Sequence, residues 1–313
     1  MRRLLDVDLR LLMILRAIVD CNGLSSAQNV LNMSESRVSA GLAELEARLG
    51  LRLCRRGRAG FALTEAGRVV YEASHELFDS VNRFKNRVHA VSDSARGILR
   101  IGTVDALITN EALPLARTLQ RFRKATKNVT IDFLNAGPEE LEAQVLSGRR
   151  DVAIGPYSRQ YADLNYVPLR QELQSLFCGN GHALFAVPEK RITIAELVRH
   201  PFVARSYLHR FDLLRVGHVE AQASVDTMEA QLILILSGEF FGYLPAHYAK
   251  SWVAKGDLRV MKPKELSYHS SLQAVTAKQN IDNRLIKRFV DLLAEECNDR
   301  DDNELEALQP LNG

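Results

Sequence analysis

Four arginines lie within seven consecutive residues, in the segment 52–58, and no acidic residue stands among them. A guanidinium group fits the oxygen atoms of a phosphate, and each phosphate that a protein neutralises on a nucleic acid releases bound counterions. Gly57 and Gly60 allow a tight hairpin here. An exposed, solvated loop would have the same composition, so the cluster is interpreted together with the helices that must position it. The arginines are Arg52, Arg55, Arg56 and Arg58.

Two short helices joined by a tight turn are predicted immediately before this cluster, after a first helix at residues 8–20. Apolar residues recur at steps of three and four from Val38 to Leu49, so one face of the later helix packs inward. Asn32-Met33 supplies the turn, and Ser25 or Ser26 could cap the helix before it. In a helix-turn-helix, the N-terminal part of the second helix meets base edges in the major groove. The candidate DNA contacts of this segment are Ser25, Ser34, Glu35, Ser36, Arg37 and Ser39.

Two of these candidates could discriminate between bases. Glu35 could accept a hydrogen bond from the cytosine amine, and Arg37 could donate to guanine. Glu35 has an alternative role, because the helix dipole favours an acid in the first turn. The charge distribution agrees with a nucleic-acid partner at this end of the chain: residues 1–96 carry 15 Lys/Arg and 11 Asp/Glu, whereas the remainder carries 26 and 27.

A long helix is predicted over residues 65–92, with Thr64 as its cap. Apolar residues follow a heptad spacing in it, with one polar member at Ser74. A long helix with an apolar seam needs a partner, which is either a second copy of the chain or its own C-terminal part. We favour the second copy, because helix-turn-helix proteins generally bind paired half-sites. The predicted dimerisation residues are Val70, Leu77, Val81, Phe84 and Val88.

From residue 97 onward, strand-like and helix-like segments alternate, which predicts a mostly parallel sheet with helices on its faces. Two similar sets of elements favour two lobes with a cleft between them. Lobe I takes residues 97–168 and 269–297, lobe II takes residues 169–268, and residues 298–313 form an acidic, solvated tail. Strands are predicted at 99–103, 129–134, 151–155, 166–169, 173–178, 201–204, 240–244 and 271–276, and helices at 111–124, 137–146, 227–237 and 282–297.

Composition excludes several functional classes. The chain has 313 residues, of which 46% are hydrophobic and 25% charged, and it contains no apolar run long enough to span a membrane. Asp6 and Asp8 interrupt the apolar stretch that a secretory signal would need, so we expect a cytoplasmic protein. The residues contain no catalytic constellation, metal-ligand spacing or phosphate loop, and we therefore expect no enzyme activity, metal or cofactor. The cysteines are expected to be reduced and buried, with a redox role for one of them as the alternative: Cys21, Cys54, Cys178 and Cys297.

The N-terminal pattern resembles the DNA-binding domain of LysR-type transcriptional regulators. The matching residues are Ser39, Leu45-Glu46, Leu49-Gly50, Arg55 and Leu63-Thr64-Glu65-Ala66-Gly67. The chain departs from the family pattern at Ala27-Gln28, Glu35-Ser36, Ala40 and Cys54, so its base preference does not follow from that of relatives.

The C-terminal part resembles the effector domain of the same family, which is similar to periplasmic solute-binding proteins. The matching residues are Ile101-Gly102-Thr103, Ser147-Gly148, the segment 151–154 and the segment 236–245. The resemblance covers residues 6 to about 297. It implies a winged helix-turn-helix over residues 6–64, a linker helix over 65–92 and a two-lobed α/β effector domain over 97–297.

The resemblance also implies a small-molecule effector in the inter-lobe cleft. Arg205 could clamp a carboxylate or be a surface charge beside Asp212, and Asp105 could hold an amine or cap a helix. The sign of the ligand charge stays open, and we prefer an amino-acid-like or carboxylate metabolite. The implied effector-binding residues are Thr103, Val104, Asp105, Asn135, Ala136, Arg205, Ser206 and Thr227.

The most consistent function is that of a ligand-responsive transcription regulator. Its partners would be double-stranded promoter DNA, a second copy of itself in a homodimer or homotetramer, and the effector, with RNA polymerase as an open further partner. Ligand in the cleft would favour one lobe geometry and so change how the DNA-binding heads are spaced. Two alternatives are a ligand-independent DNA-organising protein and an α/β solute-binding protein whose helix-turn-helix is incidental.

Overall fold

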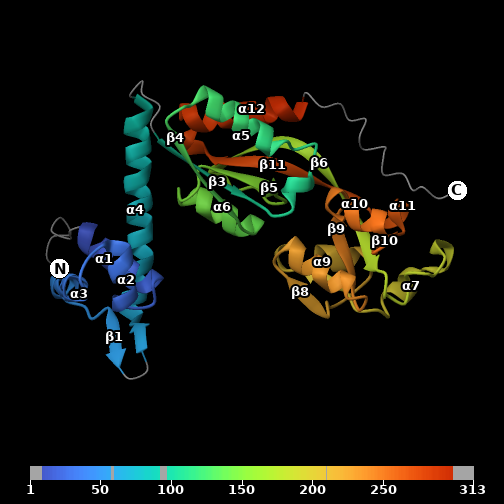
Figure 1. The fold of residues 1–313 in the computed structure, drawn as a ribbon, viewed down its shortest axis with the longest axis horizontal. Coiled ribbons are helices and arrows are strands. Elements are labelled where there is room, and N and C mark those ends of the chain that lie inside the picture. The colour runs from blue at the N-terminus through green and yellow to red at the C-terminus, as the bar shows by residue number, and fades with distance from the viewer. Residues whose placement is uncertain (1–8, 58–59, 92–96, 209, 299–313) are drawn as a thin grey trace. The chain divides into compact units, whose positions relative to one another are not determined.

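The computed structural model describes residues 9–57, 60–91, 97–208 and 210–298. Arg58 of the predicted wing, the segment 92–96 between the two predicted parts, and the acidic tail from residue 299 lie outside the described residues. The chain divides into two compact units, Met1–Phe84 and Lys85–Gly313, each of which is described by itself (Figure 1).

The first unit packs three helices and a hairpin around one apolar core, against which the start of a long helix also packs. Leu15, Ile18 and Leu45 lie at its centre and are fully buried. The elements are α1 (Leu9–Asp20), α2 (Leu24–Leu31), α3 (Glu35–Leu49), β1 (Cys54–Gly57), β2 (Gly60–Leu63) and α4 (Glu65–Val91). These bounds match the predicted helices and hairpin closely, because their contacts are local in the sequence.

One predicted helix cap is wrong. Helix α2 begins at Leu24, so Gly23 occupies the N-cap position, and Ser25 and Ser26 already lie in the first turn. The reason lies in the turn before the helix: Asn22 adopts a positive φ of 53°, which directs the chain straight into the next helix. Thr64, by contrast, caps α4 as predicted, because its Oγ1 accepts the backbone N–H of Gly67 at 2.9 Å.

The second unit is built on a seven-stranded sheet in the order β10-β6-β11-β5-β3-β4, with β9 beside the far end of β6. Helices α5 and α12 cover one face of the sheet around β3, β4 and β5, and α6 covers the opposite face (Figure 1). The strands are β3 (Gly97–Thr103), β4 (Val129–Asn135), β5 (Val152–Pro156), β6 (Leu164–Gly179), β9 (Phe241–Pro245), β10 (Leu258–Met261) and β11 (Tyr268–Ala277). These three helices are α5 (Leu115–Ala125), α6 (Pro138–Leu146) and α12 (Arg284–Asn298).

The expectation of a mostly parallel sheet is wrong. Strand β3 pairs in parallel with β4 and β5, but β11 runs antiparallel to both β5 and β6, and β9 and β10 run antiparallel to β6. The cause is the return of the chain from lobe II: β11 inserts between β5 and β6 and runs opposite to both. Strand–helix alternation predicts the parallel part, where each strand is followed by a crossover helix.

The two strands that connect the lobes are β6 and β11. The segments 166–169 and 173–178, predicted as separate strands, form the single 16-residue strand β6. Its first half pairs with β11 and its second half with β9 and β10, so β6 belongs to both lobes. Each lobe keeps its own core: Ile101, Phe122 and Phe289 are buried in lobe I, and Phe202 and Tyr243 in lobe II.

Lobe II contains several short elements that the periodicity did not predict. Helices of four or five residues are too short for an apolar period to be recognised. Besides β9, β10 and the second half of β6, this lobe contains α7 (Ile194–Leu197), β7 (Val203–Arg205), α8 (Phe211–Arg215), β8 (Ala223–Val225), α9 (Met228–Leu236), α10 (Ala246–Lys255) and α11 (Pro263–Leu266). In lobe I, α5 begins four residues later than predicted, because Pro114 occupies its N-cap position.

None of the described helices is both long and apolar enough to cross a membrane.

Candidate functional site

Helices α2 and α3 form a helix-turn-helix whose geometry follows from a few residues. Asn32 ends α2 in the left-handed conformation at φ 50°, which an asparagine tolerates, and Ser34 lies extended at the N-cap position of α3. Val38 and Leu42 face the core and are buried. Gly50 ends α3 at φ 68°, which accounts for the Leu-Gly pair of the sequence.

The exposed start of α3 carries a small polar network. The Glu35 carboxylate accepts hydrogen bonds from Ser25 Oγ at 3.0 Å and from Gln28 Nε2 at 3.2 Å, so it ties α3 to α2. The hydroxyl groups of Ser34 and Ser36 lie 3.0 Å apart. Glu35 therefore has a positioning role that neither of the two sequence-based interpretations included. The network leaves the Arg37 side chain exposed beside it.

The hairpin after α3 is held against the helices by backbone contacts. Strands β1 and β2 pair antiparallel from Cys54↔Leu63 to Gly57↔Gly60. The Glu46 carboxylate accepts the backbone N–H groups of Leu53 at 2.7 Å and Cys54 at 3.1 Å, which fixes where β1 begins. This contact is a physical reason for the Leu45-Glu46 motif, because one side-chain acceptor on α3 satisfies two backbone donors at the start of the hairpin.

The start of α4 approaches the same backbone closely. A Cβ atom added to Gly67 would lie 1.9 Å from the carbonyl oxygen of Leu53, so only glycine fits there. The Thr64 hydroxyl donates to the carbonyl oxygen of Arg52 at 2.6 Å. The motif Leu-Thr-Glu-Ala-Gly thus seats the hairpin on α4. Arg52 and Arg55 are exposed on this hairpin and its approach, while the side chains of Arg56 and Arg58 lie outside the described residues.

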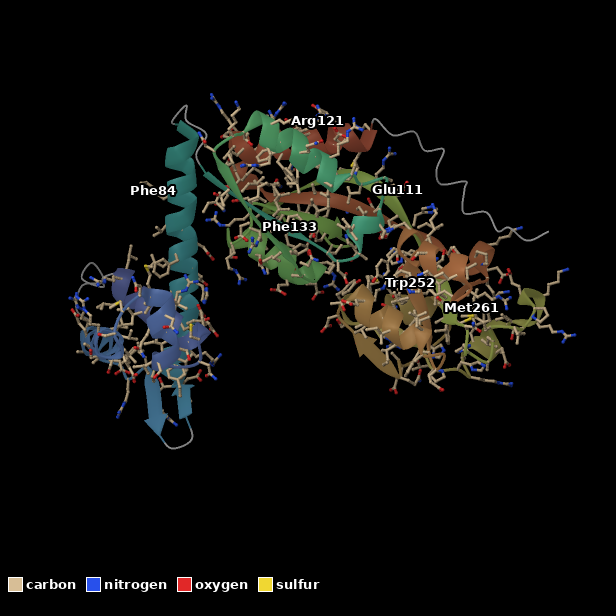
Figure 2. The ribbon with its side chains drawn as sticks, viewed as in Figure 1. Phe84, Glu111, Arg121, Phe133, Trp252 and Met261 are labelled. Carbon is tan, nitrogen blue, oxygen red and sulfur yellow. The ribbon has the colours of Figure 1, made fainter. Side chains whose placement is uncertain are left out.

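The predicted dimerisation residues of α4 fall into two groups. Val70 packs against the core of the first unit, and Ser74, whose Oγ donates to the carbonyl oxygen of Tyr71, is buried there too. Leu77 and Phe84 are 42% and 67% exposed, and Figure 2 shows Phe84 projecting from the helix. Val81 is half-buried, and the side chain of Val88 lies outside the described residues.

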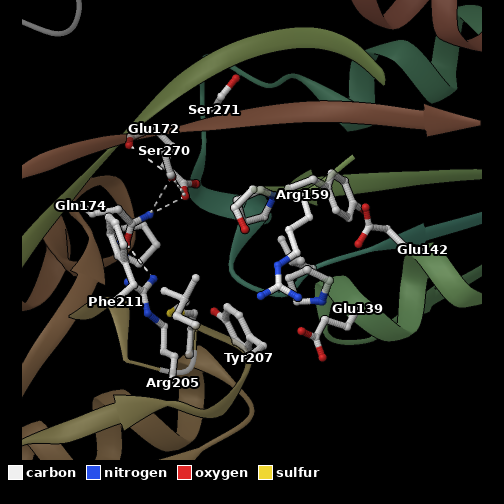
Figure 3. Close-up of a pocket in the computed structure, with 18 of the residues that line it drawn as sticks. Glu139, Glu142, Arg159, Glu172, Gln174, Arg205, Tyr207, Phe211, Ser270 and Ser271 are labelled. Atoms are coloured by element: carbon white, nitrogen blue, oxygen red, sulfur yellow. Dashed lines mark hydrogen bonds between the residues drawn. The ribbon is translucent and has the colours of Figure 1, made fainter. Parts of the chain in front are cut away.

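A cavity of about 340 Å³ lies between the two lobes (Figure 3). Its walls come from the loops after β3 and β5, from α6, from the crossing strands β6 and β11, and from the β7–α8 segment and the start of α9. The charged and aromatic residues that line it are Asp105, Glu139, Glu142, Tyr157, Arg159, Tyr161, Glu172, Arg205, Tyr207, Phe211, Tyr268 and His269.

Arg205 lines the cavity, and its guanidinium already donates four hydrogen bonds to neighbouring side chains. Its Nε and Nη2 donate to the two carboxylate oxygens of Asp212 at 2.8 and 2.9 Å, Nη1 donates to Gln174 at 3.0 Å, and Nη2 donates to the Tyr268 hydroxyl at 2.7 Å. Burial alone would lower the pKa of Arg205, but Asp212 and the nearby hydroxyls keep that pKa well above its ordinary value. The pair is therefore a permanent, internally neutralised part of the wall.

Asp105 bridges the lobes at the edge of the cavity. It follows β3 of lobe I, and its Oδ2 accepts the backbone N–H of Met228, the first residue of α9 in lobe II, at 2.6 Å. The helix dipole favours a carboxylate at this position. Burial nevertheless raises the pKa of Asp105 above its ordinary value. Asp105 thus caps a helix, as one of the two sequence-based interpretations held, but the helix belongs to the opposite lobe.

Glu172 lies on the crossing strand β6 and is also buried in the wall. Its carboxylate accepts hydrogen bonds from His247 Nε2 at 2.8 Å, Gln174 Nε2 at 2.6 Å and Asn110 Nδ2 at 3.3 Å. These donors come from α10, from β6 itself and from the end of η2 (Leu107–Thr109). The network joins lobe I and lobe II behind the cavity.

The structure brings only part of the implied effector-binding set to the cavity. Val104, Asp105 and Arg205 line it. The other five make contacts elsewhere. The Thr103 hydroxyl donates to Asn135 at 2.9 Å between β3 and β4, and Ala136 packs in a lobe I core. Ser206 donates to Asp226, and Thr227 caps α9.

Sequence reasoning missed Glu142, Arg159 and Glu172. Glu142 lies on the predicted helix 137–146, but its burial depends on tertiary contacts. Arg159 and Glu172 lie on a loop and on a strand whose pairing the sequence did not reveal.

The cysteines are free, and Cys54, Cys178 and Cys297 are buried, whereas Cys21 is half-buried. Burial raises the pKa of the Cys178 and Cys297 thiols to about 11, which disfavours the reactive thiolate.

A winged helix-turn-helix, a long helix with exposed apolar residues, and a two-lobed domain with a charged cavity define a class of ligand-binding, DNA-binding regulators. Residues 9–68 match the model of the bacterial regulatory helix-turn-helix proteins of the lysR family, and residues 92–298 match the LysR substrate binding domain. The chain belongs to the LysR family and is a LysR-type transcriptional regulator with a substrate-binding domain.

Known proteins resemble this chain over nearly its whole length. The HTH-type transcriptional activator BauR of Pseudomonas aeruginosa is 38% identical over 290 residues, which cover 92% of this chain and 95% of BauR. Among solved structures, CbnR, a LysR family transcriptional regulator, superposes with a TM-score of 0.65 at 18% identity, over 94% of this chain and 100% of CbnR. Full-length CbnR complexed with its target DNA gives a TM-score of 0.64, at 18% identity over 93% and 100% of the two chains.

Proposed function

We propose that this regulator binds promoter DNA through residues 6–64, pairs with a second copy through residues 65–92, and is controlled by a small molecule bound between the lobes of residues 97–297. The observation that carries the proposal is the inter-lobe cavity of about 340 Å³, which is within the size range of small-molecule sites. A ligand-independent DNA-organising protein would have no use for such a cavity. A solute-binding protein would have no use for the helix-turn-helix.

The DNA interface is proposed to comprise the exposed start of α3 and the arginines of the hairpin. Arg37 stands exposed next to the Glu35–Ser25 network, where a guanidinium could reach guanine, and Arg55 stands on β1, where it could reach a phosphate. Ser34, Ser36 and Ser39 would complete the contacts of α3. CbnR, whose fold is similar, has been solved on its target DNA.

A gel-shift titration of the full-length protein on its own upstream DNA tests this interface. We expect Arg37→Ala to lose about 1–3 kcal/mol of discrimination between the specific fragment and random DNA. The matched variant Arg10→Ala removes an exposed arginine of α1 and should keep that discrimination. Equal losses on specific and random DNA for Arg37→Ala would contradict base recognition by Arg37.

Helix α4 is proposed to pair two chains through Leu77, Val81 and Phe84, with Val70 and Val88 at the ends of the seam. Exposed apolar residues at heptad spacing support this, and a homotetramer could then form through the C-terminal units. Sedimentation velocity of Phe84→Glu should show a shift toward monomer. Val69→Glu, which places the same charge at an exposed apolar position off the seam, should leave the assembly unchanged. An unchanged Phe84→Glu assembly would refute the seam.

Ligand control is proposed to work through the bridge between Asp105 and α9. A ligand that changes the separation of the lobes would alter this bridge, and so shift the equilibrium between lobe geometries. A coupling of roughly 1–3 kcal/mol gives a five- to hundredfold response in DNA binding. Because BauR is named a transcriptional activator, we propose activation, with the promoter presented to RNA polymerase in the cytoplasm. Footprints with and without metabolites test this, and a footprint that no metabolite changes would count against it.

A further inference from the structure

The inter-lobe cavity has an imbalance of charge. Among the residues that the structure describes, its lining contains four carboxylates and two guanidinium groups. One of the two, Arg205, is already neutralised by Asp212, so its charge is not available to a ligand. Figure 3 shows the other, Arg159, extending into the cavity toward Tyr207. The four carboxylates are Asp105, Glu139, Glu142 and Glu172.

One corner of the cavity also holds a polar atom that lacks a partner. Tyr157 is 8% exposed, and its hydroxyl makes no hydrogen bond with any described residue. The rings of Tyr157 and Tyr166 meet edge to face, 5.9 Å apart. The Tyr166 hydroxyl donates to Glu142 Oε1 at 2.5 Å, and Glu142 is itself 6% exposed. The Tyr166 side chain therefore contacts both a buried carboxylate and the ring that carries a buried hydroxyl without a described partner.

Both groups lose hydration in this state. The Tyr157 hydroxyl has no described hydrogen bond to compensate the loss, and the Glu142 carboxylate accepts one from Tyr166 but keeps its charge. Burial raises the pKa of Glu142 and, through burial and the nearby Glu142, that of Tyr157. These directions are those of acids that have no cation at hand. A neutral ligand could satisfy the hydroxyl, but it would leave the carboxylate charge uncompensated.

A protonated amine fits the corner in charge and in hydrogen bonding. An ammonium group has three donors, so it can donate to the Glu142 carboxylate and to the Tyr157 oxygen together. The remaining lining is rich in aromatic rings, which favour organic cations. Tyr161, Tyr207 and Phe211 supply rings on both sides of the cavity.

We propose that the effector of this regulator carries a protonated primary amine, and that the amine binds between Glu142 of α6 and the hydroxyl of Tyr157. The proposal rests on the ligand-controlled function above and narrows it to amine-bearing metabolites. A carboxylate on the same molecule is compatible with the site, because the Arg159 guanidinium would donate hydrogen bonds to it. An acid without an amine would add a further negative charge beside the buried Glu142 carboxylate.

Binding of a matched series of small molecules to the full-length protein, measured by calorimetry, tests the proposal. The series has three- to five-carbon members, represented at four carbons by 1-aminobutane, butane-1,4-diamine, 4-aminobutanoate, butanoate and butanedioate. At least one amine-bearing member should bind, and its chain-length match without an amine should not. Binding of butanedioate or butanoate with no binding of any amine would overturn the proposal, as would a series in which no member binds.

Two variants locate the amine. Glu142→Gln keeps the acceptor for Tyr166 but removes the charge, and should weaken amine binding about tenfold or more, as expected for one charge-assisted hydrogen bond. Tyr157→Phe removes only an atom without a partner, so it should fold normally and weaken binding several-fold. Glu140→Gln, an exposed acid on the same helix that does not line the cavity, is the control and should bind as the parent does. Parent-like affinity of both Glu142→Gln and Tyr157→Phe would overturn the proposal.

The footprint on promoter DNA separates this proposal from the function on which it rests. If a carboxylate without an amine binds and alters the footprint, the amine assignment fails while ligand control stands. If an amine binds at Glu142 but no bound ligand alters the footprint, the assignment stands and ligand control fails.

Discussion

The two units of this regulator use the same charged residue types under opposite conditions. In the DNA-binding unit, Arg37, Arg52 and Arg55 are exposed, so water compensates their charge. In the effector domain, Arg205 and Asp212 are 4% and 1% exposed, so each depends on the other. Exposed charge in the first unit therefore contributes little to the stability of the fold, whereas breaking the buried pair in the second unit is strongly destabilising.

The largest effect should follow from separating the buried pair. Asp212→Asn leaves the Arg205 guanidinium buried without a countercharge, which costs about 3–5 kcal/mol. Trp252, the single tryptophan, lies on α10 in lobe II, so its fluorescence during urea unfolding reports on this lobe. Glu265→Gln breaks an ion pair with Lys262 in which Glu265 is 60% exposed, and should cost less than about 1 kcal/mol. Similar losses for the two variants would break the comparison between buried and exposed charge.

Acid should destabilise lobe II through a buried histidine. The His182 Nδ1 accepts the backbone N–H of Leu184, and its ring lies 5.0 Å from that of His200. Burial, and to a lesser extent His200, lowers the pKa of His182 from 6.5 to about 4. Between these values the unfolded chain binds more protons than the folded one, so stability falls as the pH decreases and is fully present above about pH 6.5. Between about pH 6.5 and pH 5, the free energy of unfolding should fall by an amount on the order of 2 kcal/mol.

Urea midpoints from Trp252 fluorescence at pH 7.5 and pH 5 measure this loss. His182→Gln should make the difference between the two midpoints smaller, because it removes the titrating group. A variant with an unchanged pH dependence would show that other groups cause the acid sensitivity.

A smaller effect is expected where a buried contact supports the exposed interface. Glu46→Ala removes the acceptor for the N–H groups of Leu53 and Cys54, and should cost about 1–3 kcal/mol in the DNA-binding unit. Because the hairpin start is then free to shift, binding to all DNA sequences should weaken too. Thermal unfolding by circular dichroism and a gel shift measure the two effects. Glu44→Gln, an exposed acid on the same helix paired with Arg48, should change neither; an unaltered Glu46→Ala would exclude the hairpin role.

The smallest effect on folding is expected for the exposed arginine of the hairpin. Arg55→Ala should shift the unfolding temperature of this unit by no more than about 2–4 °C, because the side chain is exposed and surface substitutions rarely exceed ±0.5 kcal/mol. It should instead reduce the slope of log K against log salt by about 0.9, the value for one lost phosphate contact. Binding measured at several salt concentrations checks the slope. A parallel displacement with an unchanged slope would show that Arg55 contacts no phosphate.

Much of the first unit could be predicted from the sequence. The period of apolar residues from Val38 to Leu49 predicted α3 and its inner face, and Thr64 predicted the start of α4. The cap of α2 failed, because the strong turn at Asn22-Gly23 moved the helix start. In the second unit, alternation predicted the parallel strands, but not the insertion of β11 between β5 and β6, which depends on pairing between segments about 100 residues apart.

The class of this protein and the inner and outer faces of its helix-turn-helix follow from the sequence alone, because helix caps, turns and apolar periods act over a few residues. Only the tertiary structure decided the role of the charges in the effector domain. Asp212, seven residues further along the chain, neutralises Arg205, and the crossing strands bring Gln174 and Tyr268 to the same guanidinium, so Arg205 is part of the wall and not a free ligand clamp. The function of a charged side chain depends on which partners compete for it, and here two of those partners come from distant parts of the chain.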